Sequence, residues 1–366
     1  MVEWKKLGDV CEIKTGKGIT QKDCSDEYSY PVMSGGQTPM GMYFEFNREA
    51  NTTTISRVGA YAGFVSFVKE KFYCNDKCFS VIPKIPNHFD SRFLYVVLKH
   101  KEDSIKKLQS EGGVPTINTK KLGNILIPIP SIEEQTRIVG ILDTFTASID
   151  NLKEQIAQRR KQYEYYRDQL LDLEGKEGVE MKTIKEVCKK ICSGGTPSTS
   201  KKDYYGGNIP WLRTQEVDWK DIWDTDIKIT EDAIANSSAK LIPKDCVIVA
   251  MYGATAAKVA INKIPLSTNQ ACCNLEINNN ISSYRYVYYW LCKEYQNLKG
   301  MGEGSQNNIN GQKIKDYSIP LPSLQEQQRI VSILDTFEAS IQNLEAQLSQ
   351  REKQYDYYRN KLLTFE

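Results

Sequence analysis

The sequence predicts an α+β fold, with two globular mixed α/β domains joined by two long antiparallel α-helices that form a coiled coil. Three observations lead to this prediction. A stretch of 45 residues occurs twice, each copy has the apolar spacing of a long helix, and a similar series of strand-like and helix-like segments precedes each copy. We therefore expect an internal duplication with a pseudo-two-fold axis. A chain of 366 residues has room for two ordinary domains and their connections.

The repeated stretch is the strongest signal in the chain. Residues 127–171 and 319–363 align without a gap, and 30 of the 45 positions are identical. Apolar residues recur in each copy at spacings that alternate between four and three, which is the period of a coiled-coil seam. They are Ile138, Leu142, Phe145, Ile149, Leu152, Ile156, Tyr163, Tyr166 and Leu170 in the first copy, and Ile330, Leu334, Phe337, Ile341, Leu344, Leu348, Tyr355, Tyr358 and Leu362 in the second. Each helix could instead pack on its own domain, but near-identical seams favour packing on each other.

Each seam has one polar position. Arg159 occupies it in the first copy and Arg351 in the second. A dry, unpaired arginine would be unfavourable in a coiled-coil seam. We therefore expect each arginine to lie near the exposed end of the seam or to pair with an acidic residue across it.

Both helices begin with a capping-box pattern. Ser131 stands three residues before Glu134, and Ser323 stands three residues before Glu326. In a capping box the hydroxyl accepts a hydrogen bond from a backbone N–H near the helix start, and the carboxylate accepts one from the backbone N–H of the capping residue. The pattern places each helix start directly after an apolar, strand-like run that ends in proline.

The short connection between the two halves determines the direction of the helices. A helix from Ser131 to Leu171 would be roughly 60 Å long, and only residues 173–180 separate it from the second domain. The second domain must therefore begin near the far end of the first helix, and it also directly precedes the second helix. Antiparallel helices satisfy both conditions easily.

Charge is distributed unevenly along the chain. Residues 1–126 and residues 181–318 each carry 18 lysines and arginines against 14 aspartates and glutamates, a net charge of +4. Residues 127–180 sum to −4 (7 minus 11), and residues 319–366 sum to −2 (5 minus 7). Mildly basic domains and acidic helices fit a protein whose domains meet a polyanion and whose helices do not.

Composition argues against several classes of protein. The chain is 40% hydrophobic and 26% charged, and no window approaches 18 consecutive apolar residues, so we expect no transmembrane helix. The first residues lack the apolar core of a signal peptide, which predicts a cytoplasmic protein. There are ten cysteines but only two histidines. The cysteine spacings do not suit zinc, so reduced and mostly buried thiols are expected.

Within each domain, alternating apolar and polar residues predict strands, and one run with an apolar face predicts a helix. The strand-rich segments are residues 52–83 and 246–277, and the helical segments are residues 91–108 and 283–299. An Ile-Asn pair, at 117–118 and 309–310, and a final strand then lead into each long helix. The middle parts have diverged far more than the ends, which is most simply explained by two variable readers on a common frame.

A glycine-rich loop follows the first short element of the second domain. Residues 193–198 read Ser-Gly-Gly-Thr-Pro-Ser. Their backbone N–H groups could cradle a phosphate, or the segment could be a plain turn. The loop lacks the closing Gly-Lys-Ser/Thr of a nucleotide-binding P-loop.

Polar side chains gather at the ends of the predicted strands. Arginine and glutamine can form paired hydrogen bonds with guanine and adenine edges in the major groove. The candidate DNA-binding residues are Gln37, Arg57, Tyr61, Thr196, Arg213, Gln215, Tyr252, Lys258, Asn269 and Gln270. Asn75 and Asp76 of the first domain take a place equivalent to that of Asn269 and Gln270 in the second. Each candidate could equally be an ordinary solvated side chain.

No catalytic site is recognisable in the sequence. It contains no GxGxxG, GxxxxGK(S/T) or HExxH motif, and no Asn/Asp-Pro-Pro-aromatic tetrad of the kind that amino-methyltransferases use. Glu12 and Lys14, with Asp9 nearby, match half of a nuclease motif, but this tripeptide pattern is common by chance and has no partner in the second half. We therefore expect no catalytic residue and no metal site.

The repeated IPxPSxxEQxRIVxILDTF openings, the twin helices and the two divergent basic domains resemble the specificity (S) subunit of type I restriction–modification systems, over essentially the full length. The resemblance implies two target-recognition domains, residues 1–126 and 181–318, which each read one half of an asymmetric bipartite sequence in double-stranded DNA. It also implies that the conserved helices, within residues 127–180 and 319–366, set the spacer between the half-sites. Helices of this length would span at most about 18 base pairs.

The resemblance also implies partners. Family members have no catalytic activity of their own. Two methyltransferase subunits dock on the helices and methylate adenine with S-adenosylmethionine, and two restriction subunits add translocation and cleavage that use ATP and Mg²⁺. No cofactor is expected to bind this chain itself. We expect exposed polar residues at the helix starts to contact the methyltransferase subunits, namely Glu134, Gln135, Arg137, Glu326, Gln327 and Arg329.

Two other functions compete with this interpretation. One is an enzyme, or the specificity module of a related methyltransferase–nuclease system, and a methyl-transfer assay on the isolated protein would reveal it. The other is a coiled-coil adaptor with no role on DNA, which would show no salt-dependent DNA binding. The missing catalytic tetrad argues against the first.

Overall fold

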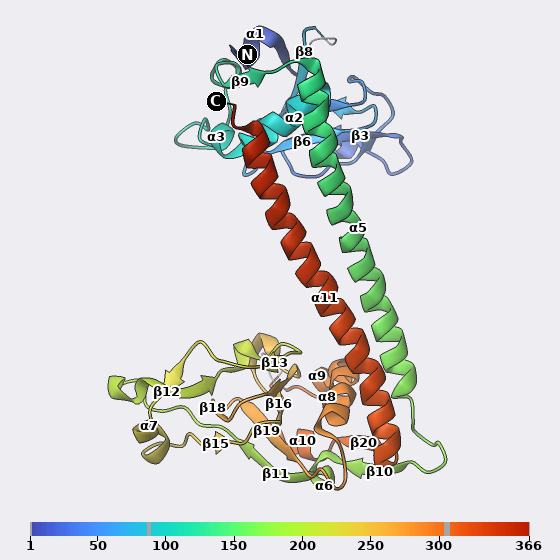
Figure 1. Ribbon diagram of the computed structural model, residues 1–366, viewed down its shortest axis with the longest axis vertical. Helices are drawn as coiled ribbons and strands as arrows, with labels where there is room; N and C mark the ends of the chain where they lie inside the picture. Colours follow the sequence, from blue (N-terminus) through green and yellow to red (C-terminus); the bar gives the residue numbers. More distant parts are fainter. Residues whose placement is uncertain (1, 86–88, 304–307, 366) are drawn as a thin grey trace. The chain divides into compact units, whose positions relative to one another are not determined.

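The computed structural model describes residues 2–85, 89–303 and 308–365 (Figure 1). The chain forms two compact units, one made of Met1–Glu154 with Glu345–Glu366 and the other of Gln155–Leu344. Each unit contains one globular part of mixed α/β structure and one end of each long helix, α5 (Ile132–Leu170) and α11 (Leu324–Leu363). The predicted α+β class, the duplication and both long helices are confirmed.

The globular part of the first unit is built on a four-stranded antiparallel sheet. Its elements are β1 (Glu3–Lys6), α1 (Leu7–Val10), β2 (Cys11–Thr15), β3 (Tyr30–Met33), β4 (Met42–Tyr43), β5 (Thr52–Ser56), β6 (Val65–Val68), β7 (Tyr73–Cys74), β8 (Cys78–Pro83), α2 (Ser91–His100), α3 (Glu102–Lys106), α4 (Thr119–Gly123) and β9 (Leu126–Ile129). The main sheet has the order β2-β8-β5-β6 and packs against α2, while β4-β3-β7 and β1-β9 form smaller sheets. The core joins Ile55, Phe79 and Phe93 to Ile138 of α5 and Leu363 of α11.

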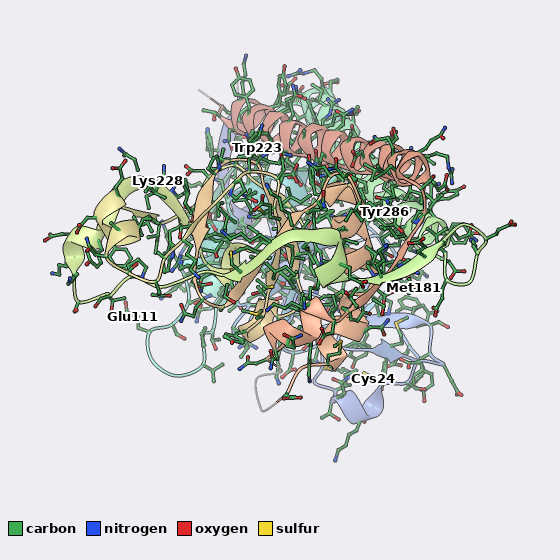
Figure 2. All side chains as sticks on the ribbon, turned by 90° about the horizontal axis from the view of Figure 1, so that it is seen from below. Cys24, Glu111, Met181, Trp223, Lys228 and Tyr286 are labelled. Carbon is green, nitrogen blue, oxygen red and sulfur yellow. The ribbon has the colours of Figure 1, made fainter. Side chains whose placement is uncertain are left out.

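The second unit repeats this architecture. Its elements besides the long helices are β10 (Glu180–Thr183), α6 (Ile184–Val187), β11 (Cys188–Ser193), β12 (Tyr205–Leu212), β13 (Asp221–Ile222), β14 (Lys228–Ile229), α7 (Glu231–Ala235), β15 (Leu241–Ile242), β16 (Val247–Ala250), β17 (Val259–Asn262), β18 (Leu266–Thr268), β19 (Cys272–Ile277), α8 (Tyr284–Lys293), α9 (Tyr295–Gly300), α10 (Gly311–Lys315) and β20 (Ser318–Leu321). Its core joins Val249, Leu275 and the fully buried Tyr286 (Figure 2) to Leu171 and Ile330.

The two globular parts share one strand order. The sheet β2-β8-β5-β6 corresponds to β11-β19-β16-β17, and β4-β3-β7 corresponds to β14-β12-β18. The second part has two further edge strands, β13 and β15, in the connection between β12 and β16. That connection, residues 213–246, has 34 residues, and its counterpart in the first part, residues 34–51, has 18. We call residues 213–246 the long connection.

Aromatic contacts show the direction of the two long helices. In the first unit, Phe145 near the start of α5 stacks on Tyr358 near the end of α11, with ring centroids 5.3 Å apart. In the second unit, Tyr166 near the end of α5 stacks on Phe337 near the start of α11 at 5.4 Å. Each unit thus pairs the start of one helix with the end of the other, so the helices run antiparallel, as predicted. The two contacts are equivalent, because both pairs are related by the repeat offset of 192 residues.

The polar positions of the seam differ from the prediction. The guanidinium carbon of Arg159 lies 5.8 Å from the ring centroid of Phe337, and that of Arg351 lies 5.6 Å from the ring centroid of Phe145. Both arginines are half-buried, and Arg351 also donates to Gln354 at 3.1 Å. A flat guanidinium can cover an aromatic face while its edge stays hydrated. An aromatic ring on the opposite helix therefore takes the place of the acidic partner that we expected.

The capping boxes at the helix starts are half confirmed. The Ser131 hydroxyl accepts a hydrogen bond of 3.3 Å from the backbone N–H of Glu134, and Ser323 does the same for Glu326. The Glu134 carboxylate, however, accepts two hydrogen bonds of 2.7 Å from Arg137. The charged Arg137 guanidinium offers two N–H groups one turn away and competes well with the neutral backbone N–H of Ser131. The Glu134 carboxylate therefore binds Arg137.

The helical segments 91–108 and 283–299 are each split in two. The breaks lie at Lys101, between α2 and α3, and at Glu294, between α8 and α9. In the first unit, the Glu102 carboxylate that opens α3 accepts a hydrogen bond of 3.0 Å from Val65 of β6. The same carboxylate also binds Lys99 of α2, so the break is fixed by contacts to the sheet that a pattern along one helix does not reveal.

All ten cysteines are free, and seven of them are buried, as the sequence predicted. Burial raises the pKa of Cys246 and of Cys273 to about 12, so these thiols stay protonated near neutral pH. Among the described residues there is no cluster of three or more histidine, cysteine, aspartate or glutamate side chains that could hold a metal ion. In the same part of the chain, no helix is long and apolar enough to cross a membrane.

Candidate nucleic-acid interface

In the first globular part, loops from several strands meet around one asparagine. The backbone N–H of Asn75 donates to the carbonyl of Met33, at the end of β3, over 2.9 Å. Its side-chain Nδ2 donates to Ile19, in the loop after β2, over 3.0 Å. The loop after β5 joins the group because Arg57 donates its backbone N–H to Lys77 at 2.8 Å. The candidate residues of this part therefore stand on one connected set of loops.

The second globular part has the same framework of backbone hydrogen bonds. Asn269 donates its N–H to the last residue of β12 at 2.9 Å, and Met251 donates its N–H to the loop before β19 at 2.8 Å. Asn269 thus occupies the place of Asn75, as the sequence pattern predicted. A methionine stands where the first part has the candidate Arg57, so one frame carries different side chains.

Two glycines allow these loops to approach closely. A Cβ on Gly16 would lie 1.4 Å from the carbonyl oxygen of Cys74, and a Cβ on Gly194 would lie 2.1 Å from that of Thr268. Only glycine fits such contacts. The N–H groups of Gly194 and Gly195 donate to backbone carbonyls at 3.4 and 2.8 Å. Residues 194–198, which include Thr196, form neither helix nor strand, and two of the N–H groups needed for a phosphate cradle are already used.

Half of the candidate side chains are exposed. They are Gln37, Tyr61, Gln215, Tyr252 and Gln270. Tyr61 and Tyr252 are 48% and 41% exposed, and they lie in equivalent turns, β5–β6 in the first part and β16–β17 in the second. The two tyrosines are not at equivalent positions, because Arg57 corresponds to Met251 and Tyr61 therefore corresponds to Thr255. Both are exposed aromatic side chains in turns of the divergent domains, where they can contact a ligand.

Several other candidates are held by neighbouring groups. Lys258 Nζ lies 2.6 Å from an Asp218 carboxylate oxygen and 4.4 Å from the ring centroid of Trp219. The Thr196 hydroxyl donates to the side chain of Gln270. A phosphate contact by Lys258 would therefore compete with an existing ion pair.

The two candidate arginines are also engaged. Arg57 Nη1 donates to the backbone carbonyl of Asp76 at 3.2 Å, and its guanidinium lies 5.7 Å from the ring centroid of Phe79. Arg213 lies 3.8 Å from the carboxylates of Glu216 and Asp226. Arg57 is held by a neutral carbonyl and an aromatic ring, so it can turn to a DNA phosphate or base at lower cost than Arg213.

Sequence reasoning missed two tryptophans of the long connection. Trp219 and Trp223 are 40% and 66% exposed, and Trp223 and Lys228 lie on the outside of the second globular part (Figure 2). The available signal was a pair of tryptophans in a charged segment, WKDIWD, that lacks apolar periodicity. Large exposed aromatic side chains in such a segment are candidates for ligand contact.

The starts of the long helices present the same ion pair twice. Arg137 binds the Glu134 carboxylate with two hydrogen bonds of 2.7 Å, and Arg329 binds Glu326 in the same way. Both arginine side chains are half exposed. These four residues are accessible on the surface of the chain, as we expected for partner-binding positions.

The prediction that Gln135 and Gln327 are exposed is wrong, because both are fully buried. Gln135 accepts a hydrogen bond of 2.9 Å from the backbone N–H of Asp90 and donates to the proline before α5 at 3.0 Å. Gln327 accepts from the N–H of Ser283 at 3.0 Å and donates to the proline before α11 at 2.9 Å. Because a buried amide needs such partners, each glutamine fastens a long helix to the helix of its globular part.

The fold and its loop framework define a duplicated protein with two divergent domains on one helical frame, and comparison with known proteins places it in a family. A family model described as the type I restriction modification DNA specificity domain matches residues 1–159 and 176–352. The chain therefore belongs to the family of type I restriction–modification specificity subunits.

Particular relatives agree. Over 385 aligned residues, the chain is 30% identical to the specificity subunit of the type I restriction enzyme EcoR124I/EcoR124II from Escherichia coli, covering 100% of this chain and 94% of the relative. It is 26% identical to a putative type I specificity subunit of Mycoplasma pneumoniae, with 98% and 96% covered. The crystal structure of a type I restriction–modification S subunit from M. genitalium has the same fold, with a TM-score of 0.71 and 19% identity over 100% of this chain and 97% of that one.

Proposed function

We propose that this chain is the DNA-recognition subunit of a type I restriction–modification complex, in which each globular part reads one half of an asymmetric bipartite target in double-stranded DNA. The observation that carries the proposal is a shared loop framework with different side chains. Arg57 in the first part corresponds to Met251 in the second, and only the second part has the long connection. Two such surfaces suit two different half-sites, because base edges are read by side chains while the frame fixes their position.

We further propose that the long helices set the spacer between the half-sites and that one methyltransferase subunit docks at each helix start. Exposed apolar side chains support this part of the proposal. Trp4, Leu126 and Ile132 in the first unit, and Met181 and Leu324 in the second, are between 39% and 51% exposed. Apolar surface beside exposed ion pairs is typical of protein–protein contact sites.

In the proposed complex, chemistry belongs to the partners. Two methyltransferase subunits use S-adenosylmethionine to methylate adenine, and two restriction subunits use ATP and Mg²⁺, while this chain binds no cofactor and has no catalytic residue. A solved structure from work on complex assembly of the type I R-M system resembles this chain with a TM-score of 0.61, which is consistent with such partners. Burial raises the pKa of core side chains such as the Cys246 thiol and the Tyr286 phenol, which suits packing and not acid–base chemistry in a cleft.

The proposal is tested first with DNA. Affinity of the assembled complex for duplex DNA should fall linearly with salt on logarithmic axes, because lysine and arginine contacts release counterions. Sequencing of methylated adenines in cells that express this chain with its methyltransferase should show one bipartite target with a fixed spacer. Methylation by the isolated chain would favour an enzyme, and salt-independent or absent DNA binding would favour a coiled-coil adaptor.

Exposed tyrosines test the assignment of half-sites. Tyr61→Ala should weaken discrimination at one half-site and Tyr252→Ala at the other, by about tenfold each if each loses one base-level contact. Tyr165→Ala is the control, because Tyr165 is exposed on α5 and far in sequence from both loop sets. Equal effects of Tyr61→Ala on both half-sites would contradict the division of labour between the domains.

A further inference from the structure

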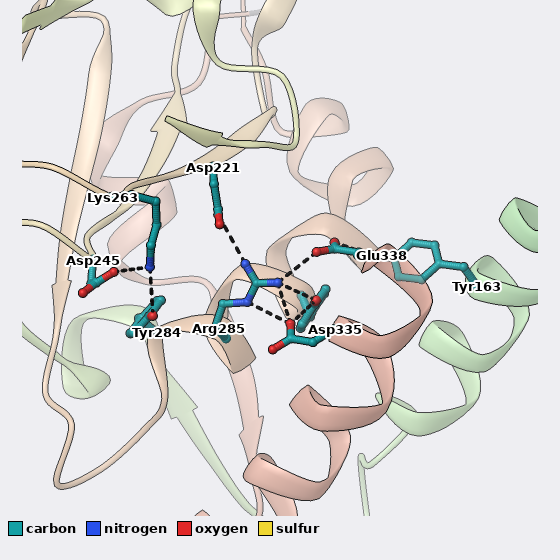
Figure 3. Close-up of polar contacts among 9 residues, drawn as sticks. Tyr163, Asp221, Asp245, Lys263, Tyr284, Arg285, Asp335 and Glu338 are labelled. Carbon is teal, nitrogen blue, oxygen red and sulfur yellow. Dashed lines mark hydrogen bonds and ion pairs between the residues drawn. The ribbon is translucent and has the colours of Figure 1, made fainter. Parts of the chain in front are cut away.

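One arginine, Arg285 at the start of α8, binds carboxylates from two different parts of the second unit (Figure 3). Its Nη1 lies 3.2 Å from Asp221, in strand β13 of the long connection. Its Nη2 lies 2.5 Å from Asp335 and 2.9 Å from Glu338, both on α11. Tyr289 completes the group by donating its hydroxyl to Asp335 at 2.5 Å. The long connection and the conserved helix are therefore joined through a single, mostly buried guanidinium.

The first unit has a simpler form of the same contact. Arg92, at the equivalent place on α2, donates three hydrogen bonds of 2.6, 3.0 and 3.3 Å to Asp143 of α5. Asp143 is related to Asp335 by the repeat offset of 192, while a threonine stands where the second unit has Glu338. The first unit lacks the long connection, so it offers no counterpart of Asp221. The arginine–aspartate pair thus attaches each globular part to its helix, and the second unit extends the pair to reach the long connection.

Backbone hydrogen bonds and one other ion pair also hold the long connection at this point. Trp219 donates its N–H to Val259 at 2.8 Å, Ile261 and Lys263 donate theirs to Lys220 and Ile222 at 3.2 and 2.8 Å, and Lys258 binds Asp218. Strand β13 of the connection is only two residues long, Asp221–Ile222, and pairs with β17 at the edge of the five-stranded sheet. These contacts join the connection to β17 and the turn before it, whereas Arg285 joins it to α11. The segment just before β13 carries two candidate DNA-binding residues, Arg213 and Gln215, and the exposed Trp219, all within eight positions of Asp221.

Charge makes the cluster depend on Arg285. Three carboxylates share one guanidinium, and the nearby Lys263 is already bound to Asp245 and Tyr284. Removal of Arg285 would leave three half-buried carboxylates without their counter-charge. Lysine could not replace it, because an ammonium group lacks the rigid fork of donors that bridges several partners.

We propose that Arg285 is a positioning residue for one half-site, which holds the long connection in a fixed place against α11 so that its side chains meet the DNA in register. This inference rests on the proposed function, in which the second globular part reads one half of a bipartite target. The cluster touches no base itself. It acts through the segment that ends at Asp221. Loss of the Asp221 contact should therefore weaken discrimination between bases at one half-site and not at the other.

The test uses the assembled methyltransferase complex and single-molecule sequencing of methylated adenine. Asp221→Asn is the main variant, because it weakens one ion pair and leaves Arg285 bound to α11; Arg285→Lys is the second. The measured quantity is methylation of a target with one changed base, relative to methylation of the intact target. Both variants should raise this ratio about fivefold to tenfold when the changed base lies in one half-site. The ratio should not change when the changed base lies in the other half-site. Arg92→Lys is the matched control, and it should leave that half-site unaffected.

Hydrogen exchange separates failure of this inference from failure of the proposed function. Asp221→Asn should speed exchange in residues 213–223 and leave strands β16 and β19 protected. Faster exchange there supports the holding role even if the wild-type complex methylates no bipartite target, a result that would overturn the proposed function. Unchanged exchange, unchanged discrimination by both variants, or equal loss at both half-sites would overturn the inference.

Discussion

At the scale of single residues, Gln135 and Gln327 show what a sequence leaves open. Each stands among polar residues at a helix start, so a surface position was the natural prediction. Their burial depends on where α2 and α8 begin, which is known only from the folded structure. One signal was available. The residues two positions before and one position after the glutamine differ between the copies, while the glutamine itself is kept.

Replacing these glutamines tests their buried hydrogen bonds. Gln135→Leu and Gln327→Leu should each lower the free energy of unfolding by about 1–3 kcal/mol, because a backbone N–H and a carbonyl lose their partners in a buried site. Urea denaturation measures the change. Gln328→Leu is the control at an exposed position, with an expected effect within about 0.5 kcal/mol. A stable Gln135→Leu variant would mean that the N–H of Asp90 has another partner.

Glu338 provides a pH-dependent contribution to stability with a defined sign. Burial raises the pKa of its carboxyl, and Arg285 opposes part of the rise. Between the ordinary pKa of the unfolded chain, about 4.3, and the raised pKa of the folded one, the folded protein binds more protons, so stability falls as pH rises. Glu338→Gln should therefore gain stability relative to wild type across that window. Unfolding at a series of pH values measures it, and a difference that does not change with pH would contradict the assignment.

At the scale of elements, periodic apolar patterns predicted the long helices correctly, whereas short irregular segments such as β13 were not predicted. The predicted helix from Ser131 to Leu171 matches α5, Ile132–Leu170, to within one residue at each end. The antiparallel direction followed from the short segment 173–180. The aromatic partners of Arg159 and Arg351 lie on the opposite helix, so the sequence of one helix does not reveal them. The two-residue strand β13 lies below the length at which alternation can be recognised.

Helix pairing is testable with the stacked aromatic residues. A double-mutant cycle of Phe145→Leu and Tyr358→Leu should give a coupling energy of about 0.5–1.5 kcal/mol, the usual value of an aromatic pair beyond its buried area. The equivalent cycle of Phe337 and Tyr166 should give a similar value, because the two contacts have nearly the same geometry. Phe145→Leu combined with Tyr166→Leu is the control and should be additive. Coupling in the control would point to an effect spread along α5 and not to the ring contact.

At the scale of the whole molecule, the duplication explains why the family was easier to predict than its site. The helices are nearly repeated, so they carry a clear family signal, whereas the loops have diverged. Lys258 was a reasonable DNA contact in isolation, yet its partners Asp218 and Trp219 come from the long connection, some forty residues earlier. Arg57, by contrast, is held mainly by neutral groups. Whether a candidate side chain is already bound within the protein thus depends on residues that are distant in the sequence.

The duplication also predicts a long-range effect of the end of the chain on its beginning. Leu363, at the end of α11, is buried in the core of the first unit, and its repeat equivalent Leu171 is buried in the core of the second. Leu363→Ala should therefore loosen the first globular part and Leu171→Ala the second, each by about 2–5 kcal/mol, the usual cost of removing a buried leucine side chain. Hydrogen exchange in β5 and β16 reads out the two parts separately. Each variant serves as the control of the other. If Leu363→Ala loosened β16 as much as β5, the two cores would behave as one cooperative unit, and the division of the molecule into two independently packed halves would be wrong.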